Sequence, residues 1–278
     1  MTRRDQNVTP PPEVLTYYAG FPEEDRLALG SCRLEFERTK EILARVLLAP
    51  PARIVDVGGA AGAYSSWLAE AGYEVHLVDA SPRLIEEARR RSAKSTAPIA
   101  SLSVADARQL PQEGGSAAGV LVMGPLYHLP AAADRAAALR EAFRVLARDG
   151  IAVVAAISRY ASALDGLARK LSLDPRFVEI RDQDLADGQH RNATGNADYF
   201  TTAYFHRPDD LRSEMEGAGF REVRVLGVEG PGWMLQDFDA RWDDAAQRKD
   251  LIDVARALES ESSLVGVSAH LLGVGRKS

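Results

Sequence analysis

The feature that most constrains the fold is an alternation of short apolar runs with longer helical patterns across residues 53–157. Runs rich in Val, Ile, Leu and Ala predict five strands, at residues 53–57, 74–79, 100–104, 118–123 and 151–157. Helical periodicity falls between several of them, at residues 64–71, 82–91 and 132–146. Strands that alternate with helices of this length form a parallel sheet through right-handed crossovers. We therefore expect an α/β, Rossmann-like, doubly wound domain.

The rest of the chain divides around this pattern. Residues 1–50 predict an N-terminal helical cap, mostly helical from about residue 13 to residue 48, and residues 51–278 predict the main domain. Residues 158–207 interrupt the alternation with one helix, at about 163–171, and a polar stretch. We interpret this segment as an insertion that covers a substrate. A helix at 208–218, a strand at 223–228, a helix at 245–261 and a strand at 263–274 complete the chain.

Composition excludes several classes of protein. The single cysteine, Cys32, excludes an internal disulfide and a zinc cluster built on several cysteines. With 34 Lys and Arg against 40 Asp and Glu, the net charge of −6 argues against a nucleic-acid binder. No run approaches the ~18 apolar residues of a membrane span, and no apolar segment follows the N-terminal arginines as in a secretory signal. These observations predict a cytoplasmic protein without a membrane partner.

The sharpest local signal is the sequence DVGGAAG at residues 56–62, directly after the first strand. Glycine lets a backbone approach a ligand closely, and the following helix presents free N–H groups. Asp79 ends the second strand, 79 − 56 = 23 residues after Asp56, where a carboxylate can accept both ribose hydroxyl protons. The dinucleotide pattern G-x-G-x-x-G fits poorly, since Ala60 and Ala63 replace its second and third glycines.

The alternative pattern, acid-x-Gly-x-x-x-Gly, fits through Asp56, Gly58 and Gly62, and together with Asp79 it resembles class I S-adenosylmethionine-dependent methyltransferases. The resemblance extends from about residue 53 to the end of the chain, although Ala60 stands at the family's usual middle glycine. It implies a seven-stranded sheet with six parallel strands and an antiparallel last strand, and S-adenosylmethionine (SAM) as cofactor.

The resemblance also implies a set of cofactor-binding residues. An acid after strand three receives the adenine amino group, which is Asp106 here, and the loop MGPLYH at residues 123–128 lies beneath the methionine part. A tyrosine or arginine of the N-terminal helices holds the methionine carboxylate, for which Tyr17, Tyr18 and Arg38 are candidates; alternatively these residues only pack the helix or lie on the surface. The complete set is Tyr18, Arg38, Asp56, Gly58, Gly59, Gly62, Asp79, Ala80, Asp106, Ala107 and Met123.

The acceptor side is predicted from the chemistry of methyl transfer. The reaction is an in-line displacement in which the protein mainly supplies proximity and orientation, and a hydroxyl or protonated amine also needs a base. Predicted catalytic residues are His190, His128 and Tyr127, and predicted substrate-binding residues are Tyr160, Arg191, Tyr204, His206 and Trp233. The alternative for the polar residues 189–192 is that they tie down their loop. His76 and His270 fall within predicted strands, so we expect them to be structural.

Competing functions fit less well. The post-strand-four loop lacks the Asn/Asp-Pro-Pro-Tyr/Phe sequence of amino-methylating DNA enzymes, and Met123-Gly124 supplies no carboxylate for a magnesium ion, so no metal is expected. The sequence predicts methylation of an O, N or C atom of a small molecule, and its Arg- and Ala-rich composition hints at a bacterial secondary metabolite. A non-catalytic SAM-binding regulatory or interaction protein remains the alternative. The acceptor and the oligomeric state are not readable from the chain.

Overall fold

A twisted seven-stranded sheet organises the computed structural model, which describes residues 13, 14, 16, 17 and 23–278. Its strand order is β3-β2-β1-β4-β5-β9-β8. The strands are β1 (Arg53–Val57), β2 (Glu74–Asp79), β3 (Ser101–Val104), β4 (Ala117–Val122), β5 (Leu146–Ser158), β8 (Arg221–Gly227) and β9 (His270–Arg276). Only β9 runs antiparallel to its neighbours in this sheet, between β5 and β8. The predicted six parallel strands and one antiparallel last strand are therefore confirmed.

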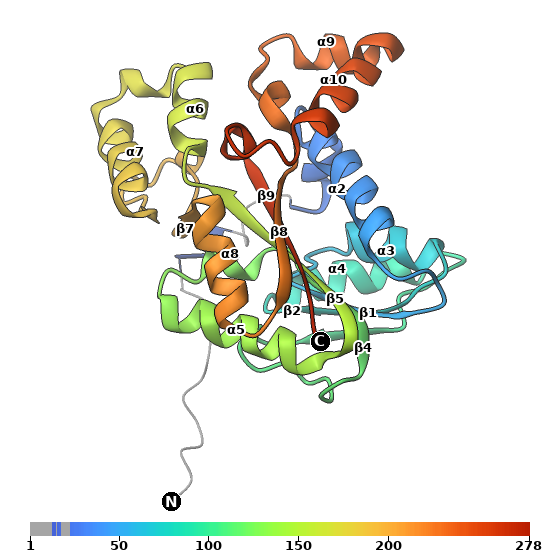
Figure 1. Ribbon diagram of the computed structural model, residues 1–278. Helices are drawn as coiled ribbons and strands as arrows, with labels where there is room; N and C mark the ends of the chain where they lie inside the picture. Colours follow the sequence, from blue (N-terminus) through green and yellow to red (C-terminus); the bar gives the residue numbers. More distant parts are fainter. Residues whose placement is uncertain (1–12, 15, 18–22) are drawn as a thin grey trace, which may run out of the picture.

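Helices cover both faces of this sheet (Figure 1). On one face pack α5 (Ala132–Val145) and α8 (Pro208–Gly217), and on the other α2 (Cys32–Val46), α3 (Ala63–Glu70) and α4 (Pro82–Ser92). Alternate residues of each strand enter the two cores: Val55 and Val57 face α5, whereas Ile54 faces α2. Burial on both faces explains why the strand sequences are continuously apolar.

A smaller apolar cluster attaches the C-terminal helices to α2. It contains Leu34 of α2, Phe238 and Trp242 of α9 (Phe238–Asp243), and Leu251 of α10 (Ala245–Leu258). Figure 1 shows α10 beside α2 above the sheet. Two short 3-10 helices, η5 (Gly230–Met234) and η6 (Val265–Val267), lie in the segments that lead away from β8 and into β9, and η1 (Glu23–Ala28) precedes α2.

The segment after β5 is more regular than its sequence predicted. It contains α6 (Ala161–Ala168), η3 (Leu171–Leu173), α7 (Pro175–Asp187), β6 (Gln189–His190), η4 (Ala197–Tyr199) and β7 (Ala203–His206). The expectation of one helix followed by an irregular polar stretch was wrong for α7. The start of α7 carries the expected signals, since the Asp174 side chain accepts a hydrogen bond from the Arg176 backbone N–H and Pro175 occupies the first turn.

The strand β7 anchors the insertion to the sheet. It pairs in parallel with the end of β5, Phe205 opposite Ile157 and His206 opposite Ser158. Because β9 occupies the other side of β5 at Ile157, β7 must continue the side of β4, beyond the end of that strand. The insertion therefore stands directly over the loop after β4, which forms η2 (Pro125–His128).

Among the described helices, none combines the length and apolar character that crossing a lipid bilayer requires.

Candidate functional site

The carboxyl ends of β1, β2, β3 and β4 surround a cleft, as expected for an open α/β sheet. We call it the strand-end cleft. The described residues that line it are Val14, Arg26, Leu27, Val57, Gly58, Gly59, Ala60, Ala61, Ala63, Tyr64, Asp79, Ala80, Ser81, Leu84, Ala105, Asp106, Ala107, Met123, Gly124, Pro125, Tyr127, His128 and Leu129. Seven of the eleven predicted cofactor-binding residues are in this set: Gly58, Gly59, Asp79, Ala80, Asp106, Ala107 and Met123.

Asp79 is held in place by backbone groups of two loops. Its Oδ2 accepts a hydrogen bond from the N–H of Ala60 at 3.0 Å, and its Oδ1 accepts one from the N–H of Ser81 at 2.8 Å. Burial raises the pKa of this carboxyl, and the two N–H groups oppose that rise. Each oxygen keeps a second lone pair, so the carboxylate can still accept two hydroxyl protons from a ligand.

The loop after β1 lies against the loop after β4. Gly58 has a φ of +73°, and a Cβ atom there would stand 2.2 Å from Cδ of Pro125. Both loops line the strand-end cleft, so their contact shapes its floor. The structure places Gly62 elsewhere: it does not line the cleft, and its missing side chain lets the loop pack on Leu77 and Ile99. The structure thus shows a packing role for Gly62, and its predicted contact with the cofactor stays a prediction.

Asp56 lies beneath this loop rather than in the cleft wall. It is fully buried, and its Oδ2 accepts a hydrogen bond of 2.7 Å from the Ser65 hydroxyl. No residue in the described part of the chain forms a hydrogen bond to its Oδ1. Burial raises its pKa to about 6, with the charge of Asp79 adding to the effect. A Cβ atom at Gly59 would come within 2.5 Å of Asp56 Oδ2, so the carboxyl group supports the loop from below.

Asp106 enters the cleft wall from the segment after β3. Arg108 binds its carboxylate with two side-chain N–H groups, both at 2.9 Å, and also pairs with Asp134 at 3.0 Å. The Asp106 carboxylate is therefore held at a fixed position beside Ala107 in the wall.

Of the predicted N-terminal contacts, Arg38 does not line this cleft. Tyr18 lies outside the described residues. Arg38 is completely buried and forms ion pairs with Glu41 and Glu259, and it lines neither this cleft nor the chamber described next. In the structure Arg38 joins α2 to the end of α10, and its predicted role in cofactor binding stays a prediction. From the N-terminal side, the cleft is instead lined by Val14, Arg26 and Leu27.

A second cavity of about 400 Å³ lies between the insertion and the sheet edge, and we call it the insertion chamber. The described residues that line it are Tyr17, Arg26, Cys32, Tyr127, Ile157, Ala161, Ser162, Asp165, Arg169, Phe177, His190, Ala197, Asp198, Tyr199, Phe200, Phe205, Trp233, Ala269 and His270. Tyr127 and Arg26 line both cavities, so the two adjoin there. Its many aromatic side chains are typical of a site for a small organic ligand.

Two of the predicted catalytic residues lie beside the junction of the cavities. Tyr127 belongs to both, and its ring packs edge-on against His128, with 4.7 Å between ring centroids. His128 lines the strand-end cleft, and its Nδ1 lies 3.4 Å from the carbonyl oxygen of Thr202. Burial lowers the pKa of His128 to about 4, which keeps the imidazole neutral near pH 7.

His190 has a different role from the one predicted. It touches the insertion chamber, but its Nδ1 lies 2.8 Å from Asp184 Oδ2 and its Nε2 lies 2.8 Å from the carbonyl oxygen of Tyr199. The ring also stacks on Phe205. With both nitrogens engaged and 1% exposure, His190 cannot take a substrate proton without losing these bonds. What the structure shows is a structural role inside the insertion, and the predicted catalytic role stays a prediction.

Of the five predicted substrate-binding residues, only Trp233 lines the chamber, where its Nε1 donates to the carbonyl oxygen of Val267 at 2.9 Å. Tyr160 packs over Gly266, and Arg191 binds the carbonyl oxygens of its own hairpin. Tyr204 lies beneath the guanidinium of Arg135, 3.6 Å from the ring centroid, and His206 is fully buried against Glu214. These four side chains therefore lie in packing or hairpin contacts outside the chamber lining, and their predicted role in substrate binding stays a prediction.

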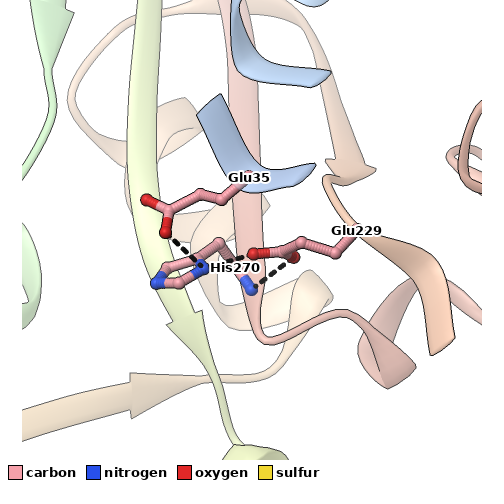
Figure 2. Close-up of side chains that lie close together, drawn as sticks. All are labelled: Glu35, Glu229 and His270. Carbon is pink, nitrogen blue, oxygen red and sulfur yellow. Dashed lines mark hydrogen bonds and ion pairs between the residues drawn. The ribbon is translucent and has the colours of Figure 1, made fainter. Parts of the chain in front are cut away.

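The sequence did not reveal a charged cluster at the chamber wall, formed by Arg26, Glu35, Glu229 and His270. Figure 2 shows the last three of these residues. His270 was expected to be structural inside a strand; β9 begins at this residue, and the residue lines the chamber. Burial opposes its protonation, but the charges of Glu35 and Glu229 raise its pKa to about 9. Glu229 follows shortly after β8, and a carboxylate at a strand end could have been predicted as a site residue. No feature of the sequence distinguishes Glu35 from the other helical glutamates.

The cluster also has the spacing of a metal site. Donor atoms of Glu35, Glu229 and His270 all lie within 4.8 Å of one another. However, Arg26 already holds both oxygens of Glu35, at 2.6 and 3.0 Å, and the backbone N–H and Nδ1 of His270 hold those of Glu229. In this arrangement the carboxylates are neutralised by protein cations.

Comparisons with known proteins agree with this geometry. Residues 54–150 match the family model of a methyltransferase domain. A ubiquinone biosynthesis O-methyltransferase of Xanthomonas campestris pv. campestris is 31% identical over 146 residues, which are 52% of this chain and 57% of that protein. The chain thus matches little more than half the length of this curated relative.

Solved structures share the fold at lower identity. SAM-dependent methyltransferases from Methanosarcina mazei and Mesorhizobium loti have TM-scores of 0.57 and 0.56 and identities of 16% and 19%. The alignments cover 85% and 88% of this chain and 96% and 100% of those chains. Phosphoethanolamine N-methyltransferase 2 of Haemonchus contortus, in complex with phosphomonomethylethanolamine and S-adenosylhomocysteine, has a TM-score of 0.56 at 15% identity, covering 87% of this chain and 52% of its own.

Proposed function

We propose that this chain, which carries a class I S-adenosylmethionine-dependent methyltransferase domain, transfers a methyl group from SAM to a small-molecule acceptor. The observation that carries the proposal is the junction of two cavities at Tyr127. One contains the carboxylate and glycine loop suited to an adenosyl ligand, and the other is an aromatic chamber. Two adjoining sites are what a reaction between two bound molecules requires.

In this proposal SAM binds in the strand-end cleft. Asp79 accepts the ribose hydroxyls, Asp106 and Ala107 border the adenine, and the backbone of Gly58 and Gly59 lies along the methionine part. When bound, SAM supplies an electrophilic methyl group on a sulfonium. The protein then needs to orient an acceptor in line with the departing sulfur and to exclude water.

The insertion, residues 158–207, closes the acceptor side of this arrangement. Phe177, Tyr199, Phe200 and Phe205 of this segment form one wall of the chamber, and Trp233 lies in the wall as well. Residue Glu13 also contacts the insertion, since its side chain accepts a hydrogen bond from Thr202 at 3.2 Å. The N-terminal segment and the insertion together enclose the acceptor, a small organic molecule of the kind found in secondary metabolism.

The direct test uses SAM labelled on its methyl group, incubated with the protein and separate pools of phenols, amines and carbon acids. We expect label in an organic product with the wild-type protein and none with Asp79→Ala. Binding of SAM with no transfer to any pool would instead support a non-catalytic SAM-binding protein. Failure of the wild-type protein to bind SAM in calorimetry would refute both functions.

A further inference from the structure

The two most exposed large apolar side chains among the described residues both lie on the insertion. Leu167 of α6 is 77% exposed, and Leu173, the last residue of η3, is 82% exposed. Their backbones are close together, because a Cβ atom at Gly166 would stand 2.9 Å from Oγ of Ser172, and each leucine directly follows one of these two residues. Figure 1 shows α6 and α7 at the outer side of the molecule, away from the sheet. We call residues 166–178 the insertion tip.

The exposed side chains of the insertion tip are all apolar or cationic. They are Leu167, Arg169, Lys170, Leu173, Pro175 and Arg176. The one acid of this stretch, Asp174, is half-buried, and its carboxylate accepts hydrogen bonds from the side chains of Arg176 and Tyr199. The outer surface of the tip therefore combines apolar groups with positive charge.

The cations of the tip differ in how far their charge is compensated. Arg169 pairs with Asp165 at 3.2 Å and with Asp198 at 3.6 Å, and both acids line the insertion chamber. The ammonium group of Lys170, between the two leucines, has no ion-pair partner in the part of the chain that the structure describes. Because the whole chain carries a net charge of −6, this local positive charge would turn the tip, rather than another face, toward an anionic partner.

We propose that the insertion tip attaches the protein peripherally to an anionic lipid surface. Leu167 and Leu173 enter the boundary between head groups and acyl chains, while Lys170 and Arg176 contact the lipid phosphates. A site for a soluble anion would have no need of exposed leucines, whereas apolar and cationic groups side by side are typical of an interfacial anchor. The expectation of no membrane partner rested on the lack of a spanning segment, which peripheral attachment does not require.

Attachment through the tip would hold the acceptor side of the molecule at the lipid. The helix α6, which carries Leu167, also lines the insertion chamber through Ala161, Ser162 and Asp165, and Phe177 of α7 lies in the same lining. Tip and chamber wall are thus parts of the same two helices. The inference goes beyond the proposed function, because it concerns where the protein works and does not depend on methyl transfer.

The test is cosedimentation of the whole chain with vesicles of phosphatidylcholine, either alone or mixed with phosphatidylglycerol, in the absence of cofactor. We expect binding to the mixed vesicles, weaker binding to phosphatidylcholine alone, and weaker binding at high salt, which screens the charges. The double variant Leu167→Ser, Leu173→Ser should bind the mixed vesicles about tenfold more weakly. Lys170→Glu should lose the preference for the mixed vesicles.

The matched control is Leu48→Ser. Leu48 is 43% exposed and lies between α2 and β1, at the edge of the sheet where the parallel strands begin, whereas the insertion follows the opposite end of β5. This variant should bind the mixed vesicles as the wild type does. Thermal unfolding followed by circular dichroism checks that each variant is folded, and all of these substitutions are at exposed positions.

Three results would overturn the proposal. The first is failure of the wild type to bind the mixed vesicles, and the second is equal binding of these vesicles by the wild type and the double variant. The third concerns a second copy of this chain as the occupant of the tip, tested by sedimentation velocity without lipid. A wild-type dimer that the double variant converts to a monomer would assign the leucines to self-association. In each case the proposed methyl transfer stands, since vesicle binding is measured without SAM.

Discussion

The carboxylate of Asp79, at the end of β2, accepts a hydrogen bond of 3.0 Å from the backbone N–H of Ala60, in the loop after β1. This bond joins the two loops on either side of the strand-end cleft. It fixes the carboxylate before a ligand binds, so the free energy of binding is not reduced by a cost of ordering this side chain. The contact is made by the backbone of Ala60, which adopts a positive φ of 49°.

Asp79→Asn should weaken SAM binding by about 1–3 kcal/mol, because one charged acceptor of the ribose hydroxyls is replaced by an amide that also presents donors. Calorimetry at pH 7 measures the affinity directly. Glu113→Gln, at an exposed position outside the cleft, is the matched control and should bind as the wild type does. If Asp79→Asn bound SAM as tightly as the control does, the assignment of Asp79 to the ribose site would be wrong.

Gly58→Ala should reduce both stability and SAM affinity, because its Cβ would strike Pro125 at 2.2 Å and displace the loop after β4. The control is Gly115→Ala, which has a similar φ of +70° but no atom within 4 Å of the added Cβ. Both variants carry the cost of a positive φ, of order 1 kcal/mol, so only the first adds a clash. Thermal unfolding and calorimetry on the pair separate these effects; equal losses would mean that the contact with Pro125 is unimportant.

His190→Ala should destabilise the protein by about 2–4 kcal/mol, since it leaves Asp184 and the carbonyl of Tyr199 without their buried partner. Urea unfolding measures the loss, and His76→Ala, at a partly exposed site, should cost much less. Under conditions where the variant remains folded, its methyl transfer should show the same dependence on pH as the wild type. If the variant lost one limb of the pH profile of methyl transfer, that result would support a catalytic role for His190 and contradict this prediction.

Asp56→Asn should change how stability depends on pH. The folded-state pKa of Asp56, about 6, lies above the ordinary value of 3.8, so the native state holds the proton more tightly than the unfolded state. Stability is therefore lost as pH rises from about 4 to 6, by up to about 3 kcal/mol. In the asparagine variant this loss is absent, and the difference in urea midpoint between pH 5 and pH 8 should shrink. An unchanged difference would show that Asp56 is ionised without penalty.

The sheet could be predicted because its strands are buried on both faces, which makes their sequences continuously apolar. Polar residues or glycines then mark where each apolar run ends. Strand β2, for example, is apolar at Val75, Leu77 and Val78 and ends at Asp79, and the structure begins and ends it at the residues that the sequence indicated. The cofactor loops follow from the same rule, since parallel strands end at one edge. Asp79 and Asp106 could therefore be placed in one cleft without knowledge of any contact.

The acceptor side was less predictable because local sequence does not say which side chain faces a cavity. His190 lies in a polar loop sequence but is enclosed by Asp184 and Phe205, whereas His270 lies at the start of a strand and lines the chamber. The environment of His270 depends on Glu35, which is 270 − 35 = 235 residues away in the sequence. Only the packing of α2 against the start of β9 brings these groups together.

The most direct test of the account is the position of S-adenosylhomocysteine in a crystal structure of its complex with this protein. The account predicts ribose hydroxyls on Asp79, adenine beside Asp106, and the sulfur directed toward Tyr127, where the strand-end cleft adjoins the insertion chamber. A ligand bound elsewhere, or bound in the cleft with its sulfur turned away from the chamber, would contradict it.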